Sequence, residues 1–422
     1  MTGGTERKRG GLWRHRDFRL LWAGETTSRL GSNVTTVALP LVAVLVLHAG
    51  TVTVSLIAAA AWVPWLVLGL PAGAWIDRLP HRPVMLLCDV VSALLFVSVP
   101  VAAWLGRLTT AHLVVVALLT GACSVLFTTA YRVYLPVLVP PAELPEGNAK
   151  LQGSESAAQI AGRGLAGVIA QWAGVVFGLV VDAATFLVSA VCLSAISARE
   201  PPRPVVRRRT TVRREIAEGL QWVAHDRYLR PLAVFSAVAN VALTGYQALQ
   251  VVFFVHVVGV APAAVGFLVA APGAGGVAGA AVAGRLARRW GSARSLLVVL
   301  LTMAPLGFLI PAATSGPGLV LPAVGGAAVG AAVVAANVLA ATFRQTYPPR
   351  AVRGRVVAFS SLLANGSSAG GALLAGGLGS LAGPRAAVWA LMGLLTAAAL
   401  VLAAGPIRAG RDFPAAAGRP QP

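Results

Sequence analysis

The ten residues Gly73-Ala-Trp-Ile-Asp-Arg-Leu-Pro-His-Arg82 close one long apolar stretch of the chain and lead into the next. A related segment, Gly284-Arg-Leu-Ala-Arg-Arg-Trp-Gly-Ser-Ala-Arg294, closes another apolar stretch 211 residues later. Near the ends of two further stretches, Ala173-Gly174 matches Ala382-Gly383 at an offset of 209 residues. Two independent matches at nearly one offset indicate that the chain is an internal duplication.

The composition around these segments is that of a membrane protein. Of the 422 residues, 57% are hydrophobic and only 11% are charged, and the mean hydropathy is +0.77. A soluble domain carries about 25% charged residues. The chain therefore has too little polar surface for an ordinary cytosolic enzyme.

A membrane-spanning helix needs about 20 apolar residues. The sequence holds twelve such stretches, at residues 18–47, 52–76, 83–105, 111–134, 152–173, 175–197, 231–258, 262–287, 295–313, 318–342, 356–381 and 385–405. The first is too long for the apolar core of a signal peptide, which has about 7–15 residues. We therefore expect an all-α integral membrane protein of twelve transmembrane helices in two six-helix bundles.

The basic residues give the expected orientation. With the N-terminus inside, 30 of the 34 Lys and Arg residues fall in tails and loops on the inner side, and Arg107 and Arg385 alone fall outside. This is the positive-inside rule, and it predicts a multi-pass protein of the inner (cytoplasmic) membrane with both termini cytoplasmic. It also accounts for the net charge of +20 without nucleic acid, and it places arginines next to anionic lipid headgroups.

A polar, Arg/Pro-rich segment divides the chain. The expected organisation is a cytoplasmic tail (1–17), a first six-helix bundle (18–197), a basic central loop (198–230), a second bundle (231–405) and a C-terminal tail (406–422). Within the loop, Glu215–Trp222 has helical spacing and predicts a short helix at the membrane surface. Parallel repeats of six spans are typical of secondary transporters.

Ionisable residues inside the spans are candidate functional sites, because each costs about 2.5–3.5 kcal/mol to insert. Glu25, Arg29 and Asn33 are spaced by four residues and share one face of the first span. We interpret this polar stripe as the lining of a transport pathway, with Glu25 as a candidate proton site. The alternative is that Glu25 and Arg29 merely neutralise each other.

Arg163 follows Gln159 by one turn in the fifth span. Two roles stay open for it: attraction of an anionic substrate, or an ion pair with Glu25 or Asp182. Asp182 lies near the outer end of its span, where we expect it to be solvated. Glu155 lies near a span start, where we expect it to be solvated or to cap the helix. Trp62 and Trp65 either stack on a ligand or pack against helices and lipid.

Further polar residues fit a cavity between spans. They are Asn240 and Gln247 in the seventh span and Asn337 in the tenth, each of which either contacts a ligand or hydrogen-bonds another helix. The three cysteines, Cys88, Cys123 and Cys192, have no CxxC spacing and are expected to be packing residues. With no HxxxH pair, GxxxxGK[ST] motif or catalytic constellation in the sequence, we expect no metal, no cofactor and no enzyme.

The opening segment resembles the loop 2–3 signature of the major facilitator superfamily, G-x-x-x-D-R-x-x-x-R. Gly73, Asp77, Arg78 and Arg82 occupy its key positions. The resemblance implies a cytoplasmic gate in which Asp77 and the arginines pair across helix ends. Asp89 of the third span either joins that network, which we favour, or belongs to the proton path. A simpler role for the two arginines is to set the topology.

A narrower resemblance is to the macrolide-efflux and enterobactin-exporter-like branch. Its marks are Phe18-Arg-Leu-Leu-Trp22, Ala38-Leu-Pro40, Glu143-Leu-Pro-Glu-Gly-Asn-Ala149 and Arg353-Gly-Arg-Val356. The run Gly162-Arg-Gly-Leu-Ala-Gly167 is similar to the antiporter signature G-P-x-x-G-G, with Arg163 in place of proline and Ala166 in place of glycine.

These resemblances imply a secondary active transporter, acting as a monomer, that exports a hydrophobic or amphipathic small molecule in exchange for protons. The alternatives are an importer of the same fold and a membrane receptor or scaffold that transports nothing. An intramembrane enzyme is disfavoured because no catalytic constellation appears.

Overall fold

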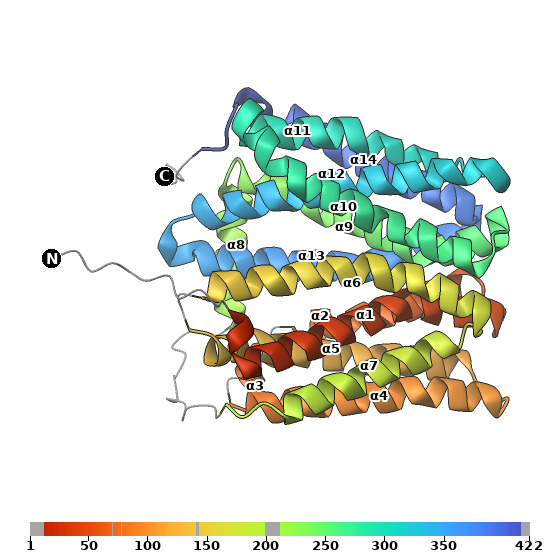
Figure 1. The fold of residues 1–422 in the computed structure, drawn as a ribbon. Coiled ribbons are helices and arrows are strands. Elements are labelled where there is room, and N and C mark those ends of the chain that lie inside the picture. The colour runs from red at the N-terminus through yellow and green to blue at the C-terminus, as the bar shows by residue number, and fades with distance from the viewer. Residues whose placement is uncertain (1–11, 70, 77, 141–142, 199–211, 415–422) are drawn as a thin grey trace.

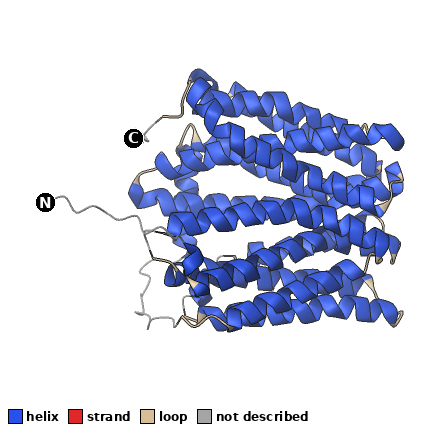
Figure 2. Cartoon of the chain, viewed as in Figure 1, coloured by secondary structure: helices blue, strands red, loops and turns tan. Residues whose placement is uncertain are grey.

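The computed structural model describes residues 12–69, 71–76, 78–140, 143–198 and 212–414. Within these ranges the protein is built from helices and contains no strand (Figure 2). The helices run along a common direction, and α1 begins at the same end of the bundle at which α14 ends (Figure 1). The all-α prediction is confirmed.

All twelve predicted stretches fall on helices. The first half contains α1 (Arg16–Leu45), α2 (Thr51–Val67), α3 (Pro71–Ile76), α4 (His81–Trp104), α5 (Thr110–Leu138), α6 (Leu144–Trp172) and α7 (Phe177–Ser194). After α8 (Val212–His225), the second half contains α9 (Leu229–Val252), α10 (Pro262–Trp290), α11 (Ser292–Met303), α12 (Val320–Thr346), α13 (Arg350–Ala382) and α14 (Pro384–Ala404).

Several of the predicted stretches are not uniform α-helices; the stretch 295–313, for example, passes into a 3-10 helix at Ala304–Leu309. Stretch 52–76 is divided into α2 and α3, because Pro71 has no N–H for the helical ladder. The end of α9 widens into a π-helix at Phe253–Val258, which stops at Gly259 with a left-handed φ of 73°.

In the described part of the chain, nine helical segments are long and apolar enough to cross a membrane. The other three predicted spans are α2, which has 17 residues, and α6 and α13. The latter two contain polar residues such as Gln159, Arg163 and Asn365. Both make contacts between the two halves of the chain, α6 with α10 and α13 with α2, so protein rather than lipid covers much of their surface.

The helix contacts repeat between the halves. In the first half α1 packs against α6 and α7, and α5 packs against α2 and α4. In the second half α9 packs against α13 and α14, and α12 packs against α10 and α11. This is the correspondence that the sequence offset predicts. The two most extensive contacts between the halves are α6 with α10 and α2 with α13. The correspondence between the halves converts each of these two contacts into the other.

The apolar cores distinguish the two ends of the molecule. One core draws residues from both halves, including Val42 near the end of α1 and Phe253 after α9. At the end where α1 begins, each half has a core of its own, with Leu21 in one and Phe343 in the other. A shared core therefore joins the halves at the end away from the start of α1.

The helix predicted at Glu215–Trp222 is present as α8, which is fixed to the second half. Arg355 of α13 pairs with Glu218 at 2.5 Å. Asp226, directly after α8, accepts hydrogen bonds from the N–H groups of Tyr228 and Leu229 and from the Tyr347 hydroxyl, each at 2.8 Å. Burial and the bond to Asp226 raise the pKa of Tyr347.

Candidate functional site

One cavity of about 480 Å³ collects the ionisable residues of the predicted spans. Its walls come from α1, α2, α4, α5, α6 and α7 of the first half and from α9 of the second. Six charged side chains line it: Glu25, Arg29, Asp89, Glu155, Arg163 and Asp182. Charged groups within membrane spans are costly and tend to mark functional sites, so their convergence makes this cavity the candidate site.

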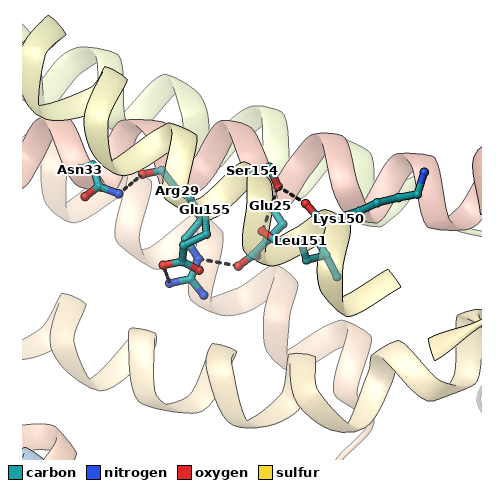
Figure 3. A network of polar contacts seen from close by, with 7 residues as sticks. All are labelled: Glu25, Arg29, Asn33, Lys150, Leu151, Ser154 and Glu155. Carbon is teal, nitrogen blue, oxygen red and sulfur yellow. Dashed lines mark hydrogen bonds and ion pairs between the residues drawn. The ribbon is translucent and has the colours of Figure 1, made fainter. Parts of the chain in front are cut away.

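The polar stripe on α1 forms an ion-pair cluster (Figure 3). The Arg29 Nε lies 2.6 Å from Glu25 Oε1, one turn away on the same helix. A second guanidinium nitrogen lies 3.6 Å from Glu155 Oε1 on α6. Asn33 donates a hydrogen bond to the Arg29 carbonyl at 2.8 Å. Arg29 therefore links two carboxylates from different helices.

The exposure of the two carboxylates differs. Glu25 is 7% exposed, whereas the Glu155 side chain is 33% exposed. Glu155 faces the cavity and Arg29 instead of sitting outside the span as a fully solvated residue. The expectation of a solvated side chain is thus met only in part.

Asp182 is wholly buried, so the prediction that it is solvated near a span end is wrong. Its Oδ2 accepts a hydrogen bond from the Thr35 hydroxyl of α1 at 2.5 Å, and its Oδ1 accepts one from Thr185 at 3.2 Å. Gly31 leaves the space for it, because a Cβ there would lie 2.5 Å from Asp182 Oδ1. The close packing of α7 on α1 carries this carboxylate into the protein interior.

Asp89 of α4 lies in the cavity wall and is 1% exposed. No basic residue in the described ranges is within ion-pair distance of it. The sequence places it in the cytoplasmic gate, and the structure places it among the cavity residues.

Arg163 also faces the cavity, near Gln159. Its Nε is buried and has no hydrogen-bond partner in the described part of the chain. The ion pairs with Glu25 or Asp182 that the sequence left open are therefore absent from the described structure.

The glycines flanking Arg163 let α6 approach two helices. A Cβ on Gly162 would lie 2.6 Å from the Leu30 carbonyl oxygen of α1, and one on Gly167 would lie 2.6 Å from the Pro262 carbonyl oxygen of α10. The same spacing recurs 209 residues later on α13. There a Cβ on Gly371 would lie 2.5 Å from the Val241 carbonyl oxygen of α9, and one on Gly376 would lie 2.8 Å from Ser55 Cβ of α2.

The polar residues of the second half separate into two places. Gln247 lines the main cavity together with Thr244 and Gln250. Asn240 and Asn337 line a second, smaller cavity of about 60 Å³ within the second half. Helical spacing does not distinguish these two cavities. It shows which residues share a face of a helix, but not which other helices that face contacts.

The gate residues are described in part. Arg82 Nε donates to the Leu193 carbonyl at 2.8 Å, and its terminal nitrogen donates to the Ser194 carbonyl. It thus joins the start of α4 to the end of α7, where carbonyl groups lack helical partners. Gly73 lies on α3 and Arg78 is exposed, whereas Asp77 is outside the described residues.

Aromatic and sulfur-containing side chains complete the cavity. The aromatic ones are Trp62, Trp65, Phe96, Phe127 and Phe186. Cys88 and Cys123 also line it, although their sequence context indicates only packing residues. Their convergence depends on the contact between α4 and α5, which no local pattern reveals. No metal-binding group of three or more ligands occurs among the described residues.

The sequence model of the Major Facilitator Superfamily matches residues 21–369. The chain belongs to this superfamily. It is 30% identical over 399 residues to the multidrug efflux pump Tap of Mycolicibacterium fortuitum, covering 92% of this chain and 93% of that protein. An uncharacterized MFS-type transporter, y4rN of Sinorhizobium fredii, is 30% identical over 274 residues, or 64% of this chain and 66% of that one.

Solved structures show the same fold over nearly the whole chain. The nucleoside transporter NupG superimposes with a TM-score of 0.72 at 12% identity, covering 92% of this chain and 98% of that one. A bacterial homologue of the iron transporter ferroportin in an inward-facing state gives a TM-score of 0.70 at 17% identity, covering 93% and 98%. The protein is therefore a multi-pass secondary transporter of small molecules and not an enzyme.

Proposed function

We propose that this transporter exports a hydrophobic or amphipathic small molecule in exchange for protons, by alternating access. The observation that carries the proposal is the Glu25–Arg29–Glu155 cluster inside a cavity with an aromatic lining. A titratable carboxylate and a hydrophobic ligand site then share one space, which is what coupling of the two requires. The resemblance to macrolide-efflux transporters and the identity to the pump Tap support the outward direction.

The moving bodies are the two six-helix bundles, residues 18–197 and 231–405. They share one apolar core at the end away from the start of α1 and have separate cores at the other end. With both termini in the cytoplasm, as the basic residues predict, this arrangement corresponds to a state closed to the outside. The protein acts as a monomer in the cytoplasmic membrane, with its basic loops against lipid headgroups.

Protonation supplies the switch in this scheme. In the described state Glu25 and Glu155 both attract Arg29, at 2.6 and 3.6 Å. A proton on Glu25 removes one of these charges and leaves Arg29 attracted to α6 instead of held within α1. A ligand or proton shifts a conformational equilibrium only by its difference in affinity between the two states. The loss of the stronger ion pair provides such a difference.

Flux of a hydrophobic dye into inside-out proteoliposomes tests the function. An imposed pH gradient should drive accumulation, and a protonophore should abolish it. Gradient-driven movement of the dye in the opposite direction would show that the protein is an importer with the same fold. Complete absence of flux for every dye, with correctly folded protein, would favour the receptor or scaffold.

A further inference from the structure

Arg163 is a charged cavity residue with no counter-ion in the described protein. Its Nε is buried and makes no hydrogen bond, and no described carboxylate lies within ion-pair distance. Arg29 provides the contrast in the same cavity, because it contacts both Glu25 and Glu155. The two arginines therefore have different roles.

The chemistry of arginine limits how this charge can be compensated. A buried carboxylate such as Asp89 or Asp182 can take up a proton and become neutral. A guanidinium cannot lose its proton in a protein, so the half-buried Arg163, whose Nε is wholly buried, keeps its charge in the cavity. An anionic group that enters the cavity would supply the missing negative charge.

Packing does not explain the presence of Arg163. The run 162–167 corresponds to Gly371-Ala-Leu-Leu-Ala-Gly376, which makes the equivalent close contacts on α13. In that copy the position of Arg163 is taken by Ala372, which is fully buried. The close helix contacts thus form without an arginine at this position.

The surrounding cavity wall is suited to an apolar body. Trp62 and Trp65 of α2 and Phe186 of α7 line the same space. Aromatic faces of this kind bury large apolar groups and stack on other rings. An anionic group at Arg163 and an apolar body against these rings would fill one cavity.

We propose that the ligand is an amphipathic organic anion, whose carboxylate, sulfonate or phosphate group pairs with Arg163. This inference rests on the proposed transport function, which it refines by naming a substrate class. An amphipathic organic cation, attracted by Asp89 and Asp182, which form no ion pair with a described basic residue, is the competing outcome of the test.

The test uses three pyrene probes with the same four-carbon tail, ending in a carboxylate, an alcohol or an ammonium group. Binding to the full-length protein in lipid nanodiscs is followed by energy transfer from tryptophan, with empty nanodiscs as the blank. The variants are Arg163→Ala, which copies the second half of the chain, and Arg163→Lys, which keeps the charge. Arg107→Ala, in an exposed connection between α4 and α5, is the matched control.

Wild-type protein should bind the carboxylate probe about tenfold or more tightly than the alcohol, as expected for a charge-assisted hydrogen bond. Arg163→Ala should remove this preference and leave alcohol binding within about twofold, Arg163→Lys should retain most of it, and Arg107→Ala should retain all of it. Equal wild-type affinities for the three probes, or tightest binding of the ammonium probe, would overturn the proposal.

The wild-type comparison can overturn the proposal even if Arg163→Ala does not fold, and Arg163→Lys then tests the assignment to Arg163. The measurement also requires no gradient, so it separates the two proposals. Selective binding of the carboxylate probe without proton-driven flux would contradict the transport function alone. Flux without selectivity for the anion would contradict this inference alone.

Discussion

Gly167 of α6 and Gly266 of α10 are in backbone contact where the two halves of the protein meet. A Cβ on Gly266 would lie 2.7 Å from the Gly167 Cα, and one on Gly167 would lie 2.8 Å from the Gly266 Cα. Because the neighbouring atoms are backbone, neither helix can yield by a side-chain rotation. Gly167→Ala should therefore separate α6 from α10, lower the thermal stability and reduce transport several-fold.

Gly164→Ala is the matched control for this contact. A Cβ at Gly164 would meet nothing within 4 Å, so this variant should melt and transport like the wild type. The repeat offers a second pair: Gly376→Ala should be harmful, because its Cβ would lie 2.8 Å from Ser55 Cβ, and Gly377→Ala should be neutral. Equal melting temperatures and transport rates across the four variants would contradict the role of these contacts.

Asp182 should stabilise the contact between α1 and α7. It is wholly buried and accepts hydrogen bonds from Thr35 and Thr185. Removal of one partner from a buried hydrogen bond costs about 1–3 kcal/mol. Thr35→Val, which keeps the shape but removes the donor, should therefore lower the melting temperature of the purified protein by several degrees.

A hydroxyl outside this contact provides the comparison. Thr302 of α11 donates to the Val298 carbonyl of its own helix, and Thr302→Val should leave the melting temperature nearly unchanged. If Thr35→Val has the same melting temperature as Thr302→Val and the wild type, the hydrogen bond to Asp182 contributes nothing to stability. Asp182→Ala would then be expected to behave in the same way.

The sequence predicts the helices and the polar stripe of α1 well, because both depend on local pattern. Hydropathy locates all twelve stretches, and the i, i+4 spacing of Glu25 and Arg29 places them on one face. The central segment 198–230 also contains the predicted short helix, now seen as α8. Length, composition and periodicity are sufficient for such features.

Tertiary contacts explain what the sequence could not give. Asp182 looks solvated when judged by its distance from a span end, yet Gly31 and Thr35 of α1 bury it. Asn240 and Asn337 line a second cavity, and their position in the sequence does not reveal which helices cover the faces on which they lie. The correspondence between Arg163 and Ala372 was accessible from the repeat offset. Its significance appears once the equivalent glycine contacts are seen.

The cytoplasmic gate is tested at Arg82 and Asp77. Arg82 binds the Leu193 and Ser194 carbonyls at the end of α7, so Arg82→Ala should loosen α4 from α7 and reduce transport by at least tenfold. Arg132→Ala removes an exposed charge of α5 and should transport normally. Asp77→Ala should abolish transport and leave membrane insertion intact. Normal transport by Asp77→Ala, measured at equal protein levels, would reduce the segment's role to setting topology.

The coupling role of Glu25 is tested by separating gradient-driven transport from exchange. Glu25→Gln keeps the size of the side chain but cannot carry a proton on and off, so it should lose accumulation driven by a pH gradient. Exchange of labelled for unlabelled substrate needs no net proton movement and should continue at a comparable rate. Glu155→Gln should have a smaller effect, because Glu155 is more exposed and its contact with Arg29 is longer, 3.6 Å against 2.6 Å.

Glu146→Gln makes the same substitution on the exposed start of α6, where Glu146 pairs with Lys150 at 3.2 Å. It should preserve both gradient-driven accumulation and exchange. Should Glu25→Gln accumulate substrate as well as Glu146→Gln does, Glu25 is not the proton carrier. Loss of exchange as well as accumulation would instead assign Glu25 to substrate binding or to the fold. Coupling through Glu25 requires that Glu25→Gln lose accumulation but keep exchange. In that variant the side chain can no longer carry a proton, while the path for substrate is kept.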